Sequence, residues 1–135
     1  MERINIKIEG SVFLITIFAV AFVSALVMGM LHMNIEEIQL AQNHIYAAEA
    51  LAIAEAGLND AFAELRVDAD WRSGFAAKSF KGGSYDVNVT GSLPTLVIQS
   101  IGASSQGFIA KVEADVTLSS NSPYVIRIDN LRINE

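Results

Sequence analysis

The sequence predicts an α+β protein in which one long N-terminal helix packs on a small four-stranded antiparallel sheet. Three observations support this fold class. Residues 11–33 form an almost uninterrupted apolar run, residues 35–66 lack proline and are rich in Ala, Glu and Leu, and apolar and polar residues alternate from residue 84 onward. A helical pattern followed by a series of strands is typical of this class. We expect a ladle shape, with half of the helix bare and half lying on the sheet.

The composition argues against several classes of protein. Of 135 residues, 52% are hydrophobic and 18% are charged, which is too apolar for a chain that is disordered throughout. The formal net charge of -6 disfavours direct binding of nucleic acid, because phosphates repel a negative surface. The absence of cysteine excludes disulfides and thiolate metal sites. With two histidines and no recognisable catalytic motif, we expect no enzymatic activity, no metal and no cofactor.

The N-terminal part reads as a short hydrophilic leader, residues 1–10, and a membrane-spanning half of the helix, residues 11–35. A helix over residues 11–33 spans roughly 35 Å at about 1.5 Å per residue, enough to cross a bilayer core of about 30 Å. A secretory signal peptide has a shorter apolar region, and the rest of the chain could hardly wrap an apolar rod of this length. An uncleaved signal anchor remains an open alternative.

The basic residues predict the orientation of this span. Arg3 and Lys7 precede it, and the next basic residue along the chain is Arg66. Because positively charged residues favour the cytoplasmic side, we expect a single-pass membrane protein with a cytoplasmic N-terminus and an extracytoplasmic segment 36–135.

The helix is expected to continue as an amphipathic half over residues 36–66. Leu51, Leu58, Phe62 and Leu65 follow helical spacing and form one apolar stripe. Three further apolar residues widen it: Ile45, Ala54 and Ala61. This apolar stripe must be buried, and we expect it to pack on the apolar face of the sheet, which also needs a partner surface. Gly57 is a weak point of the helix.

Residues 67–83 are expected to form a connecting loop, and residues 84–135 the sheet. Alternation predicts strands at residues 84–91, 95–103, 108–118 and 124–133. Val112 and Val116 belong to the inward set of the third strand. The inward positions of the last strand slip near Asp129 and Asn130, which indicates a β-bulge. Short links between the strands favour an antiparallel meander.

Three sequence elements, in this order, resemble a known family. The hydrophilic leader ends in Gly10 directly before the apolar run, residues 46–50 (YAAEA) and 55–58 (EAGL) follow it, and residues 70–72 (DWR) precede the pattern GGSY at 82–85. Over nearly the whole chain they are similar to type IV pilin-like proteins, most closely to PilX-type minor pilins and related pseudopilins.

The resemblance implies a structural subunit that assembles through its apolar helix. A prepilin peptidase would cut after Gly10 and methylate the new N-terminus at Ser11. Partners would be the membrane, other pilin subunits in a homo- or hetero-oligomeric filament, and the assembly platform of a pilus, a secretion system or a DNA-uptake device. After assembly the protein would be part of an extracellular filament. The residues expected to pack between neighbouring helices are Phe13, Ile15, Ala19, Ala21, Ser24, Ala25 and Gly29.

One position departs from the family pattern. Ile15 would be the fifth residue of the processed chain, where most pilins carry Glu. A carboxylate in lipid needs a partner charge, whereas isoleucine needs none. This departure is typical of minor subunits rather than of the major one. The alternative function is an uncleaved, singly anchored extracytoplasmic domain for binding or adhesion.

Overall fold

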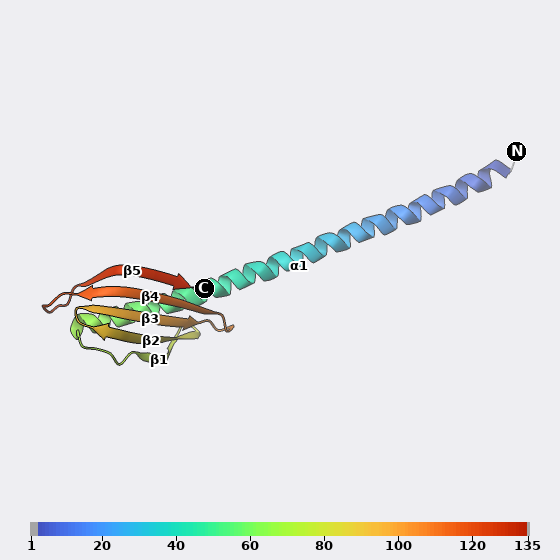
Figure 1. Cartoon of the computed structure of the whole chain (residues 1–135). Helices are drawn as coiled ribbons and strands as arrows, with labels where there is room; N and C mark the ends of the chain where they lie inside the picture. The colour runs from blue at the N-terminus through green and yellow to red at the C-terminus, as the bar shows by residue number, and fades with distance from the viewer. Residues whose placement is uncertain (1–2, 135) are drawn as a thin grey trace. The chain divides into compact units, whose positions relative to one another are not determined.

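The computed structural model describes residues 3–134 of the chain. It divides into two compact units, Met1–Gln42 and Asn43–Glu135. Helix α1 (Arg3–Val67) supplies the described part of the first unit and opens the second (Figure 1). The expected long N-terminal helix is therefore confirmed.

In the first unit, α1 begins earlier than the sequence predicts. The helix includes Arg3 to Gly10, which were expected to form a separate leader. Met1 and Glu2 of that leader lie outside the described residues, as do the side chains of Arg3 and Lys7 that predict the orientation. The physical reason is simple, since residues 3–9 contain no proline or glycine that would end a helix.

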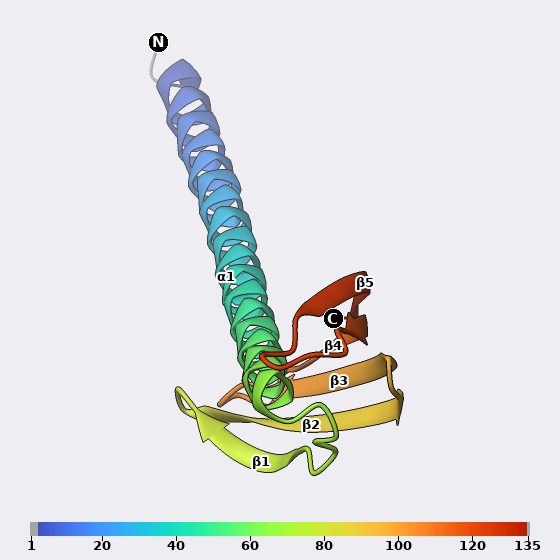
Figure 2. The same ribbon diagram turned by 90° about the vertical axis from the view of Figure 1, so that its left-hand side faces the viewer.

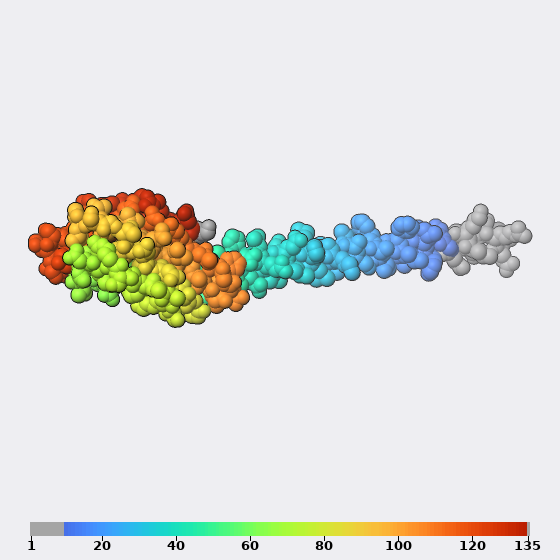
Figure 3. Space-filling model, turned by 60° about the horizontal axis from the view of Figure 1, so that its bottom comes forward, coloured from blue at the N-terminus to red at the C-terminus, as the bar shows by residue number. Residues whose placement is uncertain are grey.

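From Gly10 to Gln42 all residues of α1 are exposed, so no described segment covers this part of the helix. Figure 3 shows its side chains (blue to cyan) standing free around the axis. It is long and apolar enough to cross a membrane, as the sequence predicts.

The second unit is a two-layer arrangement of α1 from Asn43 onward on an antiparallel sheet. The sheet has five strands and not the four expected. They are β1 (Phe75–Phe80), β2 (Gly83–Ser92), β3 (Thr95–Ala103), β4 (Ile109–Leu118) and β5 (Ile126–Asn134). Their order in the sheet is β1-β2-β3-β4-β5, so every strand pairs with its neighbour in sequence (Figures 1 and 2). The predicted meander is confirmed.

Strand β1 lies within the segment 67–83 that was expected to be a loop. Apolar and polar residues do not alternate regularly in this strand, and its pairing with β2 shifts register between Phe75 and Lys78. Ala77 lies inside the strand with a positive φ of 45°, and Lys81 follows it with the same value. These irregularities remove the period of two by which strands are recognised.

The core lies between α1 and the middle strands. Helix residues Ala50, Ala54 and Ala61 are fully buried, and Ile53, Leu58 and Leu65 lie beside them. The facing side of the sheet contributes large apolar side chains that are likewise buried: Tyr85, Val87, Val89, Leu96, Ile98, Val112 and Val116.

Two glycines let the helix approach the sheet closely. A Cβ added at Gly102 of β3 would lie 2.3 Å from the backbone oxygen of Ala50 and 2.4 Å from the backbone nitrogen of Ala54. A Cβ added at Gly57 of α1 would lie 2.4 Å from Oγ of Ser100. Gly57 therefore serves close packing of helix on sheet.

The last strand contains the expected bulge. Asp115 of β4 pairs with Asn130, but the next residue, Val116, pairs with Ile128, so Asp129 is the extra residue. The bulge keeps Ile128 and Leu131 on the helix side of the sheet, opposite Val116 and Ala114. Both are about half exposed, at 49% and 48%, so α1 covers this edge of the sheet less completely than the middle.

Candidate functional site

The largest exposed apolar surface among the described residues is the part of α1 between Val12 and Leu40. Phe13 is 69% exposed and Ile15 is 64% exposed. Ala19, Ala21, Ser24, Ala25 and Gly29, the other residues expected to pack between helices, are exposed as well. Gly10 and Ser11, the expected processing site, lie within the continuous helix and are exposed.

The helix brings only some of these residues together. Ala21, Ala25 and Gly29 follow one another at intervals of four, so they lie along one side of α1, and Ser24 adjoins Ala21 at an interval of three. We call these four residues the small-residue lane. A Cβ added at Gly29 would meet nothing within 4 Å, so the chain itself leaves the space beside the lane open.

Two of the expected packing residues lie elsewhere. Ile15 and Ala19 are four apart and share a side with each other, but Ala19 is only two residues from Ala21 and so faces away from it. Phe13 lies on the flank of the lane, about three turns before Ser24. The predicted set therefore covers two sides of the helix instead of one.

The two hydroxyls in the apolar stretch are satisfied within the helix. Thr16 Oγ1 donates to the backbone oxygen of Val12 at 2.8 Å, and Ser24 Oγ donates to that of Val20 at 2.8 Å. Bonded in this way, neither hydroxyl opposes the transfer of the helix into lipid.

The predicted helix–sheet residues all lie at the core, but not in one row. Leu58, Leu65, Val112 and Val116 are buried, whereas Leu51 and Phe62 are only partly buried and pack at its margin. Ile45, expected to widen the stripe, is 64% exposed and lies outside the core, so this expectation is wrong. The helix rests on its small residues, because Gly102 and Ser100 bring the backbones too close for larger ones.

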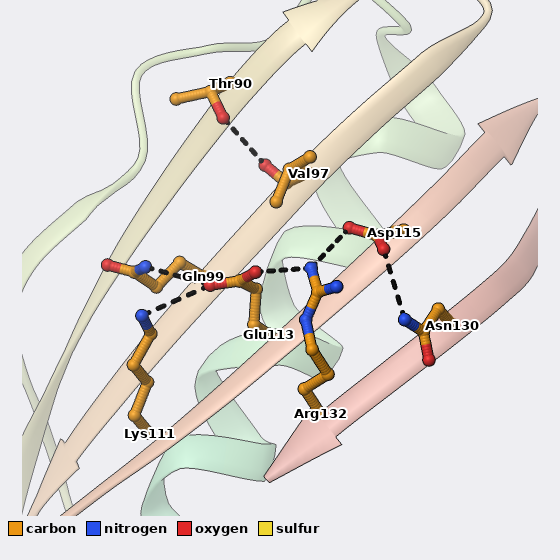
Figure 4. Close-up of polar contacts among 8 residues, drawn as sticks. All are labelled: Thr90, Val97, Gln99, Lys111, Glu113, Asp115, Asn130 and Arg132. Carbon is orange, nitrogen blue, oxygen red and sulfur yellow. Dashed lines mark hydrogen bonds and ion pairs between the residues drawn. The ribbon is translucent and has the colours of Figure 1, made fainter. Parts of the chain in front are cut away.

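The face of the sheet turned away from α1 carries a polar network (Figure 4). Glu113 of β4 is its centre. It accepts hydrogen bonds from Gln99 Nε2 at 3.2 Å and from Arg132 at 2.5 Å, and it forms an ion pair with Lys111 Nζ at 3.2 Å. Arg132 also donates to Asp115 at 2.9 Å. The network therefore joins strands β3, β4 and β5.

These contacts shift the pKa values of the groups that make them. Hydrogen bonds from Gln99, Lys111 and Arg132 lower the pKa of Glu113 to about 2. The hydrogen bond from Glu113 and the charge of Asp115 raise the pKa of Arg132. Thr117 and Arg127 likewise lower the pKa of Asp129. These shifts favour the ionised forms of Glu113, Asp129 and Arg132 at neutral pH, as in a stabilising surface network.

A second cluster joins β1 to the helix. Lys78 Nζ donates to Asp60 Oδ2 at 2.6 Å, and the hydroxyl of Tyr85 donates to the same oxygen. The ammonium of Lys78 also lies 4.4 Å from the centre of the Phe75 ring. The hydrogen bonds from Lys78 and Tyr85 lower the pKa of Asp60, and burial raises that of Tyr85. The cluster holds the irregular strand β1 against α1.

Sequence reasoning did not identify these two clusters. The alternation of β4 shows that Lys111, Glu113 and Asp115 point the same way, but their partners depend on strand register. Asp60 and Lys78 are joined only through a strand that the sequence does not predict.

Comparisons with protein-family models, with curated proteins and with solved structures found no match for this chain.

Proposed function

We propose that this chain is a structural subunit, a minor pilin or pseudopilin, of a type IV pilus or a related secretion filament. In this proposal it is inserted in the inner membrane with a cytoplasmic N-terminus and an extracytoplasmic head. A prepilin peptidase cuts it after Gly10, and the assembly platform transfers it into the filament.

The observation that carries the proposal is the exposed apolar half of α1 in a chain that also forms a folded head. Burial of a Val, Leu, Ile or Phe side chain is worth roughly 1.5–3 kcal/mol, so a row of them from Val12 to Leu40 does not stay in water. Lipid, or a set of similar helices, must surround this stretch.

The small-residue lane supports transfer from lipid to neighbouring helices. Lipid tails are as apolar as leucine, so helices associate in a membrane by close packing and not by exclusion of water. Ala21, Ala25 and Gly29 allow a second helix to approach closely along one side. The hydroxyl of Ser24 is already bonded within its own helix, so it presents no unsatisfied donor there.

The proposal is tested by the mass of the mature chain. The protein is expressed with an active prepilin peptidase, extracted from membranes and measured intact. With active peptidase, the measured mass should be that of a chain that begins at a methylated Ser11. With inactive peptidase, it should be that of a chain that keeps Met1.

Two variants make this test specific. Gly10→Val should block processing, because in this proposal the peptidase cuts after Gly10, whereas Gly29→Val should leave processing unchanged. Both glycines lie in α1 with open space around them, so the helix can accommodate either substitution. A chain that keeps Met1 in the presence of active peptidase would refute the pilin proposal.

That outcome would favour a second candidate function, an uncleaved anchored domain for extracytoplasmic binding or adhesion. The observation behind it is the apolar stretch of α1, which is long enough to anchor the chain in a membrane without any processing. Such a protein would stay in the membrane fraction and would be absent from filaments sheared off the cell surface.

A further inference from the structure

A cavity lies at one end of the sheet in the second unit. Its volume is about 380 Å³, within the range of small-ligand sites. Three segments that are distant in sequence line it: the turn after α1, the β2–β3 turn and the β4–β5 connection. The lining includes Asp70, Leu93, Pro94, Leu118, Ser120 and Tyr124.

Backbone hydrogen bonds fix these segments to one another. Leu118 donates its backbone N–H to the oxygen of Pro94 at 2.9 Å, which joins the two turns. Tyr124 donates to the oxygen of Arg66 at 3.4 Å, which joins the β4–β5 connection to the end of the helix. The cavity is thus built before any ligand arrives, so binding need not order its walls.

The walls combine apolar surface with a few free polar groups. Leu93, Pro94 and the ring of Tyr124 supply apolar and aromatic surface. The hydroxyl of Ser119, also in the lining, accepts from Val125 N at 2.8 Å, so it is already engaged. Within residues 3–134 the carboxylate of Asp70 accepts no hydrogen bond and forms no ion pair.

The lining carries a single charge, and that charge is negative. It contains one carboxylate and no lysine or arginine. The guanidinium of Arg72 keeps its positive charge, but it lies outside the lining and is held at the turn by the backbone oxygens of Ala69 and Trp71, at 2.9 and 2.7 Å. An anionic ligand would meet only repulsion from the lining, whereas a cation would gain a partner for Asp70.

We propose that this cavity binds an arginine side chain presented by a partner polypeptide. A guanidinium can donate two parallel hydrogen bonds to one carboxylate and can stack on an aromatic ring, which are the groups that Asp70 and Tyr124 offer. The methylene stem of arginine would lie on Leu93 and Pro94. This inference does not depend on processing at Gly10 or on assembly through the helix.

The test uses the full chain in detergent micelles, labelled with ¹⁵N. The probe is Nα-acetyl-arginine amide, whose blocked ends resemble a residue within a polypeptide. Amide shifts at Asp70, Ser120 and Tyr124 should saturate with a dissociation constant on the order of 1 mM. The neutral isostere Nα-acetyl-citrulline amide should bind about tenfold more weakly, because it lacks the charge.

Two variants assign the effect to the cavity. Asp70→Asn should raise the dissociation constant for the arginine probe about tenfold. Glu64→Gln removes the same charge from an exposed helix position outside the lining, and it should change the constant by no more than about twofold. Unchanged fluorescence of Trp71 would confirm that both variants are folded.

Several results would overturn the proposal. They are equal binding of the citrulline and arginine probes, unchanged binding by the Asp70→Asn variant, and a failure of the wild-type shifts to saturate below about 50 mM probe. Saturating shifts at these residues with glucose instead of the arginine probe would refute it too, since the cavity would then be a neutral sugar site.

Discussion

Replacing Gly102 by alanine should strongly destabilise the second unit. The new Cβ would lie 2.3 Å from the backbone oxygen of Ala50, 2.4 Å from the nitrogen of Ala54 and 3.0 Å from its Cα. A carbon and an oxygen in contact need about 3.3 Å. The helix would therefore have to lift from the sheet by about 1 Å, because backbone atoms cannot rotate away as a side chain can.

The size of the effect follows from this displacement. A gap of 0.5–1 Å already forfeits about a quarter to a half of the dispersion attraction between the atoms it separates. Overpacking of a core typically costs about 1–3 kcal/mol. Because the collision involves two backbone positions, we expect about 3 kcal/mol, the upper end of that range.

The assay is urea unfolding of the full chain in detergent micelles. Trp71 is the one tryptophan, and its ring packs at the core 5.2 Å from that of Phe75, so its fluorescence reports the unfolding of this unit. With a slope of about 1.5 kcal/mol per molar urea, the midpoint should fall by about 2 M.

Gly107→Ala provides the matched control. It adds the same methyl group in open space, at a φ of 84°, so only the backbone conformation opposes it, at a cost of roughly 1–2 kcal/mol. A loss for Gly102→Ala no larger than that for Gly107→Ala would refute the close-contact reasoning.

Four further predictions test other features of the chain. The ionised carboxylate of Glu113 has a pKa lowered to about 2, so it contributes stability that is present above about pH 4.3 and lost as the pH falls toward 2. Urea midpoints should therefore decline less below that pH in Glu113→Gln than in the wild type, and parallel declines would contradict this. Ser100→Ala removes a buried hydroxyl that has no partner among the described residues, and it should raise the unfolding free energy by about 1 kcal/mol. A decrease would show that the hydroxyl is satisfied. Lys78→Met removes the ion pair with Asp60, so it should speed amide exchange in β1 while leaving β4 unchanged. Equal exchange rates in β1 with and without the change would argue against its role. Ala25→Leu should weaken self-association in lipid bilayers, measured by energy transfer between labelled copies, whereas Ala19→Leu on the other side of the helix should not. Equal effects would exclude the lane as the contact.

Sequence patterns predict the elements of this fold better than they predict the contacts between them. Alternation identifies β2 to β5, and in β2, β3 and β4 it follows from burial of alternate residues toward α1. Strand β5 alternates in sequence although its residues after Ile126 are exposed. Alternation misses β1, where Ala77 has a positive φ and the register shifts. Periodicity is a property of regular backbone, so an irregular strand leaves no such signal.

The position of the helix on the sheet is harder to predict. Spacing alone favours large residues such as Leu51 and Phe62 as the centre of the stripe, yet these lie at the margin of the core. The centre is made of Ala50, Ala54 and Gly57, because Gly102 draws the two backbones together. That choice depends on a residue about fifty positions away, which no local pattern reveals.

Some features of the candidate site can likewise be predicted from the sequence, and others cannot. The apolar half of α1 is evident from composition alone, and a helical wheel separates Ala19 from the small-residue lane. The partners of Glu113 and the cavity beside Asp70 depend on segments that only the folded chain brings together. The partners of Glu113 depend on the register of the strands, and the cavity depends on the turns between them. Local sequence patterns reveal neither.

The extra residue in β5 decides what chemistry each side of that strand displays. If β5 kept Asp129 but paired with β4 without the bulge, Arg132 would share a side with Ile128 and would be directed toward Val112 and Ala114. The guanidinium would then lie over the core and would no longer bridge two carboxylates. By accommodating one extra residue, the bulge keeps the apolar and the charged side chains of this edge on opposite sides of the sheet.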